Sequence, residues 1–361
     1  MPTSAIFPRA PVRAGMYESF YLRAVAPEQP VGAWIRLTVH KRPGRLPKGS
    51  VWCTVFDSRR GAPFMHKLTG LEPGEPAGGW IELDGARLTP REAEGRCGGA
   101  HWSLQLACEE PELRHLPVSW LYRAPLPRTK LTSPMPAARF DGLLELPGQS
   151  AVDVRGWRGM VGHNWGSEHA ERWIWLHGID FSEQPEAWLD VALGRVRVAG
   201  RLTPWIANGV LSLGARRYRV GGLTARGLRV AEAPGGCRLE ITGEHGLKLE
   251  ARVGFPPEAA ARWRYADPAY EEPDTPGPVE PALGSTAPPS PQVAPPGSHD
   301  VINCSVAALE ITVRLAGESR SRTLWTAHGG AYELGARRRP APGTYTVPSS
   351  QHADSTSFQE T

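Results

Sequence analysis

Short runs of alternating apolar and polar residues recur along this chain, separated by Gly, Pro and Asp. Runs of this length, rich in Val, Ile, Thr, Tyr, Phe and Trp, are typical of antiparallel β-strands. In the first half they fall at 18–25, 33–40, 51–57, 79–83 and 101–107. In the second half they fall at 173–181, 187–198, 210–213, 238–242, 247–253, 303–315 and 322–326. The pattern predicts an all-β fold of sandwiches or barrels.

Proline marks the expected domain boundaries. Four prolines in residues 122–137 (Pro125, Pro127, Pro134 and Pro136) interrupt the alternation, which predicts an extended connection between two β-domains. We therefore expect an N-terminal arm at 1–14, a first domain at 15–136 and a second at 137–340. Ten prolines in 267–297 predict a disordered loop at 267–298, because such a segment buries too little apolar surface to order. Residues 341–361 are expected to be a disordered tail.

Charge and cysteine content exclude several classes. The 41 basic and 37 acidic residues are interspersed, which argues against nucleic acid as a partner. The five cysteines are widely spaced and form no Cys-x-x-Cys, so neither a disulfide framework nor a thiolate zinc site is indicated. A reduced, cytoplasmic setting is expected.

The N-terminal residues lack the apolar run of a signal peptide, and no segment approaches the roughly 18 apolar residues of a membrane span. This leaves open a transient contact with a membrane surface. The oligomeric state is not determined by the sequence.

The richest concentration of reactive side chains lies in residues 159–178, which hold three His and three Trp. In a strand over this segment, Trp173, Trp175 and His177 would share one face. The chain has 13 Trp, including Trp188, and large rings of this kind either fill the space between sheets or line a cavity. A β-barrel can enclose one small ligand, so these side chains, with Trp165, are candidate ligand-binding residues.

The same segment offers acid–base groups. His163 titrates near neutral pH, and Glu168, Glu171 or Asp180 could orient it, while Asn164 could hold a water or a carbonyl. The candidate catalytic residues are therefore His163, Glu168 and Asp180. The alternative is a tight turn at 162–166, in which His163 and Asn164 bond to local backbone.

Metal and nucleotide chemistry have less support. His163, His169 and His177 with Glu168 lack the close spacing of a zinc motif, so no metal is expected. His299 could join them only through tertiary structure. No Gly-x-Ser-x-Gly, phosphate loop or Gly-x-Gly-x-x-Gly after a strand occurs.

The residues 162–166, Gly-His-Asn-Trp-Gly, followed by Trp-Ile-Trp at 173–175 and His-Gly at 177–178, resemble a family signature. The family includes carotenoid 1,2-hydratase (hydroxyneurosporene synthase) and AttH-like proteins, with relatives among tocopherol cyclase-like proteins and fungal pericyclases. The resemblance in architecture spans residues 17–335, and the motif spans 159–178. It implies two consecutive lipocalin-like β-barrels and a hydrophobic pocket.

The resemblance also implies water- or proton-dependent chemistry on an isoprenoid- or polyketide-like substrate, without a cofactor. In a hydratase or cyclase of this kind an acid protonates an alkene, and indole faces such as those of Trp165, Trp173 and Trp175 stabilise the carbocation. The residues leave open whether the protein is such an enzyme, in the lyase or isomerase class, or a non-catalytic carrier of a lipid or pigment. A structural protein whose own side chains fill the cavity is a third reading.

Overall fold

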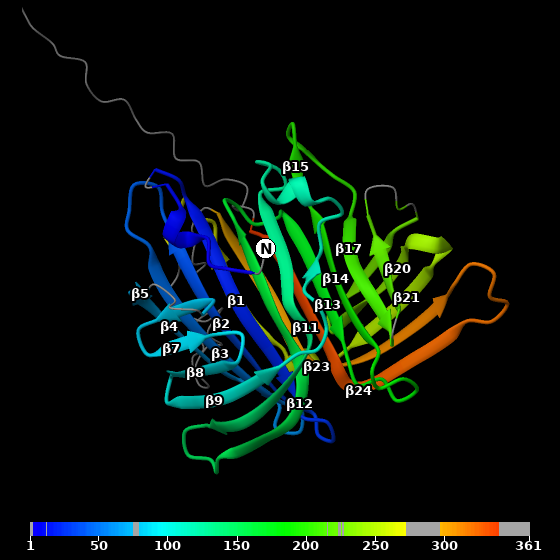
Figure 1. The fold of residues 1–361 in the computed structure, drawn as a ribbon, viewed down its shortest axis with the longest axis horizontal. Helices are drawn as coiled ribbons and strands as arrows, with labels where there is room; N and C mark the ends of the chain where they lie inside the picture. Colours follow the sequence, from blue (N-terminus) through cyan, green and yellow to red (C-terminus); the bar gives the residue numbers. More distant parts are fainter. Residues whose placement is uncertain are drawn as a thin grey trace, which may run out of the picture.

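The computed structural model describes residues 3–11, 13–74, 79–214, 216–222, 225, 227–271 and 297–338. Within these ranges the strands form two large antiparallel sheets, one after the other along the chain (Figure 1). The first sheet contains β1 (Met16–Val25), β2 (Val31–Lys41), β3 (Lys48–Asp57), β4 (Phe64–Leu71), β5 (Pro73–Gly74), β6 (Ile81–Leu83), β7 (Ala86–Leu88), β8 (Glu92–Cys97), β9 (Ala100–Ala107), β10 (Leu113–Arg114), β11 (Thr129–Glu145) and β12 (Val152–Gly166). The predicted all-β fold of two consecutive antiparallel β-domains is confirmed.

The second sheet contains β13 (Arg172–Gly178), β14 (Trp188–Arg195), β17 (Ile206–Leu213), β18 (Arg216–Gly221), β19 (Arg229–Ala233), β20 (Gly236–Thr242), β21 (Lys248–Gly254), β22 (Ala261–Ala266), β23 (Ser298–Arg314) and β24 (Arg322–Arg337). The short strands β15 (Arg197–Val198) and β16 (Arg201–Leu202) form a separate ribbon. The helical turns are η1 (Phe7–Arg9), η2 (Ser119–Tyr122), η3 (Glu244–Gly246) and η4 (Pro257–Ala259). No helix in the described ranges is long and apolar enough to cross a bilayer.

The chain changes sheet between β12 and β13, about thirty residues beyond the expected boundary at 136 and 137. That boundary falls inside β11, where Pro134 and Pro136 coincide with two register shifts against β12. Proline cannot donate to a ladder, but a bulge leaves a residue unpaired, so a strand can contain proline at such a point. Pro134 and Pro136 therefore belong to an irregular strand, whereas Pro125 and Pro127 lie in the connection between β10 and β11.

The other predicted segments are described only in part. The expected arm at 1–14 includes η1, and its Ala5 and Phe7 are buried in the core of the first domain. Within the predicted loop at 267–298, residues 272–296 lie outside the described residues, as does the expected tail at 341–361. The two ends of that loop meet, because the Asp267 backbone N–H donates to the Gly297 carbonyl at 3.1 Å.

Strand β1 separates the two cores. Its residues Phe20, Leu22 and Ala24 belong to the core of the first domain. Tyr21 and Val25, on the opposite face, pack in the core cluster of the second domain. Because alternate residues of a strand point to opposite faces, this one strand is buried on both sides. The layer between the domains is therefore built on this face of β1 together with Trp34 of β2 and with Trp52 and Phe56 of β3.

Arg23 lies on that interdomain face and is fully buried. Its Nε and Nη2 donate to the Ser305 carbonyl at 3.2 and 2.8 Å, and Nη2 also donates to the Gly329 carbonyl at 2.9 Å. Its Nη1 donates to His177 Nδ1 at 3.0 Å. Burial lowers the pKa of Arg23 to about 9. A single side chain of the first sheet thus satisfies three acceptors of the second.

Replacing Arg23 by Met tests this cross-link. The change leaves the His177 ring nitrogen and the Ser305 carbonyl without their Arg23 donor, while the Gly329 carbonyl keeps the Ile179 backbone N–H. We therefore expect the free energy of unfolding to fall by about 3 kcal/mol. Urea unfolding measures it. The control is Arg155→Met, at an exposed side chain paired with Asp153, which should change stability by no more than about 0.5 kcal/mol. Equal effects of the two substitutions would contradict the assignment.

Candidate functional site

The predicted row of Trp173, Trp175 and His177 faces the first domain and does not point into the second barrel. Trp175 meets the Tyr21 ring edge-on at 5.8 Å, and its Nε1 donates to Asp190 at 3.0 Å. His177 accepts from Arg23 at Nδ1 and donates from Nε2 to the Pro136 carbonyl at 3.0 Å. The aromatic row therefore forms part of the interdomain layer, with all the polar atoms of His177 satisfied.

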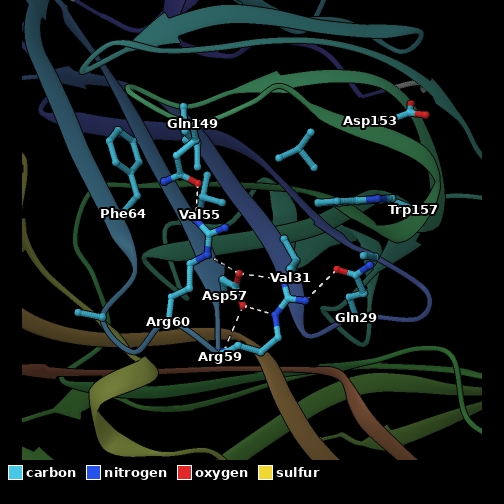
Figure 2. Close-up of a pocket in the computed structure, with 14 residues that line it drawn as sticks. Gln29, Val31, Val55, Asp57, Arg59, Arg60, Phe64, Gln149, Asp153 and Trp157 are labelled. Carbon is cyan, nitrogen blue, oxygen red and sulfur yellow. Dashed lines mark hydrogen bonds and ion pairs between the residues drawn. The ribbon is translucent and has the colours of Figure 1, made fainter.

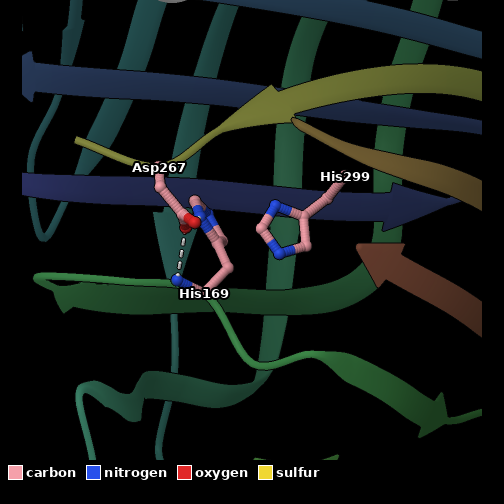
Figure 3. Close-up of side chains that lie close together, drawn as sticks. All are labelled: His169, Asp267 and His299. Atoms are coloured by element: carbon pink, nitrogen blue, oxygen red, sulfur yellow. Dashed lines mark hydrogen bonds and ion pairs between the residues drawn. The ribbon is translucent and has the colours of Figure 1, made fainter. Parts of the chain in front are cut away.

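At the Trp173 end of this row, His169 and Asp267 form a dyad (Figure 3). The His169 backbone N–H and its ring Nδ1 both lie against Asp267 Oδ1, at 2.8 and 3.1 Å. Arg337 Nη2 is 2.7 Å from the other carboxylate oxygen. Because the carboxylate accepts, Nδ1 carries the proton and Nε2 keeps its lone pair. His169 Nε2 is buried and has no hydrogen-bond partner among the described residues.

A second imidazole lies beside the dyad. His299 is fully buried, and its ring centre is 5.2 Å from that of His169. Within the part of the chain that the structure describes, no side chain hydrogen-bonds to either of its ring nitrogens. Burial, followed by the charge of His169, lowers the pKa of His299 to about 3. Burial also lowers the pKa of His169. Burial alone would raise the pKa of Asp267, but the hydrogen bonds and charge of His169 lower it overall. At neutral pH the cluster therefore holds two neutral imidazoles and one carboxylate.

Aromatic rings enclose this dyad. Tyr17 stacks on His169 with ring centres 4.0 Å apart, and Trp173 lies 5.7 Å away on a near-parallel plane. Tyr265 is 5.8 Å from His169, and its hydroxyl donates to Glu333 at 3.2 Å. Glu333 also accepts from Trp173 Nε1 at 2.8 Å. Burial raises the pKa of Tyr265 well above its usual value. We call His169, Asp267, His299, Trp173 and Tyr265 the interdomain cluster.

His163, the predicted catalytic histidine, occupies a different place. Its Nε2 donates to Glu18 at 2.7 Å, and its ring is sandwiched between Phe20 at 3.9 Å and Trp165 at 4.5 Å. Glu18, also fully buried, accepts from the backbone N–H groups of Ile6 and Phe7 in the arm. Phe20 belongs to the core of the first domain. These contacts give His163 a structural role at the point where the arm closes that core.

The segment around His163 is a regular strand and not the tight turn considered above. Gly162 lets the Tyr21 ring of the neighbouring β1 pack directly on β12, because a Cβ at position 162 would lie 2.2 Å from that ring. Asn164 points to the opposite face of the strand from His163, and its buried Oδ1 has no partner among the residues that the structure describes.

The remaining predicted residues are dispersed. Glu168 pairs with Arg128 and Arg337, the latter at 2.7 Å. Asp180 pairs with Arg158 at 2.6 Å. Trp188 is fully buried beneath the Arg217 guanidinium, in a small apolar cluster separate from Trp173. Both carboxylates are thus engaged by arginines and lie outside the interdomain cluster.

Several members of the interdomain cluster were missed by sequence reasoning. His169 was considered only as a metal ligand, and Asp267 was assigned to the disordered loop. The signal for Asp267 is the alternation of Trp263 and Tyr265, which continues β22 directly up to it. His299 enters β23 opposite Tyr265 in the register of β22 and β23. Only this pairing brings His299 to Asp267.

A separate pocket of about 250 Å³ lies at one end of the first domain (Figure 2). Its apolar wall includes Phe64 and Trp157. Its rim is closed by polar contacts: Arg59 donates to Gln29 at 3.1 Å and Arg60 to Gln149 at 2.5 Å. Both arginines also pair with Asp57. The pocket contains none of the predicted site residues.

His169, Asp267 and His299 could also hold a metal ion, since each offers a ligand atom within 4.8 Å of the others. Histidine and carboxylate ligands suit zinc or iron. However, the Asp267 oxygens already accept from His169 and Arg337, and the positive charges of Arg36 and Arg337 bear on the two histidines. A dication would be repelled by these guanidinium groups. The surroundings favour an acid–base role.

No protein-family model matches the chain. Two curated and uncharacterised Mycobacterium tuberculosis proteins, Rv0493c and MT0513, are each 30% identical to it over 281 residues. The match covers 73% of this chain and 79% of theirs. The chain belongs to the family of these mycobacterial proteins.

The family's fold is shared with solved structures. The structure of CghA with Sch210972 matches with a TM-score of 0.52 at 13% identity, over 93% of this chain and 94% of that one. The AttH protein of Nitrosomonas europaea matches with a TM-score of 0.49 at 12% identity, over 94% and 99% of the two chains. The CghA match confirms the tandem β-domain fold that the resemblance to AttH-like proteins predicts.

Buried neutral histidines make the stability of this family member depend on pH. Burial lowers the pKa of His177 to about 4, against about 6.5 in an unfolded chain. As the pH falls from about 6.5 to 4, His177 therefore binds a proton in the unfolded state but not in the native state. We expect His177 to account for a loss of about 3 kcal/mol over this range.

Urea unfolding at a series of pH values checks this dependence. His177→Asn should flatten the slope, whereas the control His101→Asn, at an exposed histidine, should keep the wild-type slope. Identical slopes in all three proteins would contradict the prediction.

Proposed function

We propose that the protein binds an apolar, isoprenoid- or polyketide-like small molecule between its two β-domains and catalyses a cofactor-free hydration, cyclisation or isomerisation there. The observation that carries the proposal is the His169–Asp267 dyad, whose buried Nε2 has a free lone pair beside Trp173 and Tyr265. A histidine that a carboxylate orients can act as the general base in a proton transfer.

The dyad can move a proton in both directions. Neutral His169 takes a proton at Nε2 from a water molecule or from an acidic C–H, and Asp267 stabilises the imidazolium that forms. The imidazolium then returns the proton to another atom of the ligand. Arg337 and the His169 backbone N–H hold Asp267 in place, so the ring keeps its orientation through the cycle.

The surroundings suit an apolar ligand and the imidazolium that His169 becomes. The rings of Tyr17, Trp173 and Tyr265 around His169 attract the positive charge that its ring gains with the proton. The unpartnered nitrogens of His299 offer polar contacts to an oxygen of the ligand or to an attacking water. CghA, which shares this fold, was solved with Sch210972, a precedent for ligand binding on it.

A non-catalytic carrier is the second candidate. The observation in its favour is that Glu333 already binds Trp173, Tyr265 and Asn303, which makes part of the layer a satisfied structural network. In a carrier the same cluster would orient a polar head group without converting it.

The test begins with solvent extraction of the protein from its native host and mass spectrometry of the apolar compound released. Incubated with that compound or its unsaturated precursors, the wild type should form a product of altered retention, either heavier by one water or of equal mass. His169→Gln should lower kcat by about a thousandfold because it removes the base, while ligand affinity changes little.

The matched control is His163→Gln, which removes another buried histidine bound to a carboxylate. It should retain turnover and lose thermal stability. Loss of turnover in His163→Gln with full turnover in His169→Gln would overturn the assignment. Stoichiometric release of a compound that is never converted would favour the carrier.

A further inference from the structure

The connection between β10 and β11 carries large apolar side chains that face solvent. Val118, Trp120 and Leu126 are 38%, 65% and 58% exposed. We call residues 118–128 the η2 loop, since η2 forms its first part. Single exposed apolar residues are common on protein surfaces. Three of them within nine positions of one loop, a tryptophan and a leucine included, indicate an interaction surface.

Hydrogen bonds from Tyr122 and Lys130 fix the backbone of the η2 loop. The Tyr122 hydroxyl donates to the Leu131 carbonyl at 2.9 Å and accepts from the Leu116 backbone N–H at 3.1 Å. Lys130, largely buried, donates to the Ala124 carbonyl at 2.9 Å and to the Pro127 carbonyl. The buried polar groups under the loop fix its backbone, so the outward direction of Trp120 and Leu126 is built into the fold.

The η2 loop also adjoins the interdomain cluster. Thr129, the residue that follows the loop, accepts from the Tyr17 hydroxyl at 3.2 Å and donates to the Glu168 carbonyl at 2.7 Å. Tyr17 in turn stacks on His169 at 4.0 Å. One aromatic ring therefore separates the base of the loop from the proposed acid–base group.

The charges in the η2 loop itself are positive. Arg123 and Arg128 are exposed, and the loop has no acidic residue. Glu168, the nearest carboxylate partner, is shared between Arg128 and Arg337. Exposed Trp and Leu flanked by Arg match a bilayer surface with anionic head groups, where the indole lies at the interface and the guanidinium binds phosphate.

We infer that the η2 loop docks the protein reversibly on an anionic lipid surface, with the interdomain cluster close to that surface. The inference deepens the proposed function, on which it rests for the apolar nature of the ligand. A compound that partitions into lipid would then enter the interdomain layer from the membrane.

The test is flotation of the full chain with phosphatidylcholine vesicles, with and without about one-third anionic phospholipid. The wild type should bind the anionic vesicles, more weakly at high salt. Trp120→Ser combined with Leu126→Ser should lower the partition coefficient about tenfold, because the apolar area entering the interface is lost.

Trp325→Ser is the matched control, since Trp325 on β24 is 42% exposed and outside the η2 loop. It should bind as the wild type does, and both variants should keep the wild-type melting temperature. Absence of binding to either vesicle type, or equal loss in the control, would overturn the inference. A concentration-dependent oligomer that the double variant abolishes, without vesicle binding, would assign the loop to a protein contact and also overturn it.

The two proposals fail separately. Turnover of the extracted compound in dilute detergent does not need a membrane, so the double variant should retain it there. Vesicle binding does not need proton transfer, so His169→Gln should still float. Loss of only one property therefore identifies which proposal is wrong.

Discussion

The buried guanidinium of Arg23 is the contact on which the geometry of this molecule depends. It lies on the interdomain face of β1 and donates to two carbonyls and one imidazole of the second domain. An arginine without water needs every donor satisfied, because burying an unpaired cation costs several kcal/mol. Arg23 therefore favours the relative position of the two β-domains in which these acceptors face β1.

That position determines where chemistry can occur. Tyr17 and Arg23 lie on the same face of β1, six residues apart, so fixing Arg23 also fixes Tyr17 against His169. His169 lies between β12 and β13, where the chain changes sheet, and Asp267 directly follows β22. The proposed acid–base dyad is thus assembled from the connections of the second domain and completed by a ring from the first.

The sequence predicted the repeating strands and the shared face of Trp173, Trp175 and His177, because alternation within one strand is a local property. It did not predict which layer this face would enter, since that depends on how the domains pack. His163 was favoured over His169 because of its position in a glycine-flanked motif. Its partner Glu18 is 145 residues away, and only the pairing of β1 with β12 brings the two together.

Composition predicts the wrong local structure at two places. Pro134 and Pro136, the two prolines of β11, resemble part of a linker, although both lie at register shifts that a strand can absorb. Asp267 looked like the start of a disordered loop, although it directly follows β22 and is anchored by His169 and Arg337. In both cases long-range contacts decide the local structure, and a single sequence does not display them.

We propose that the ligand binds between the domains, at the interdomain cluster, and not inside the first β-domain. Photocrosslinking with an apolar diazirine probe, followed by peptide mass spectrometry, tests this placement. We expect adducts on β13 and β22, at residues such as Trp173 and Tyr265, and the natural compound should compete them away. The proposed placement would be contradicted if the adducts that the natural compound competes away were confined to the core of the first domain, at residues such as Phe20 beside His163.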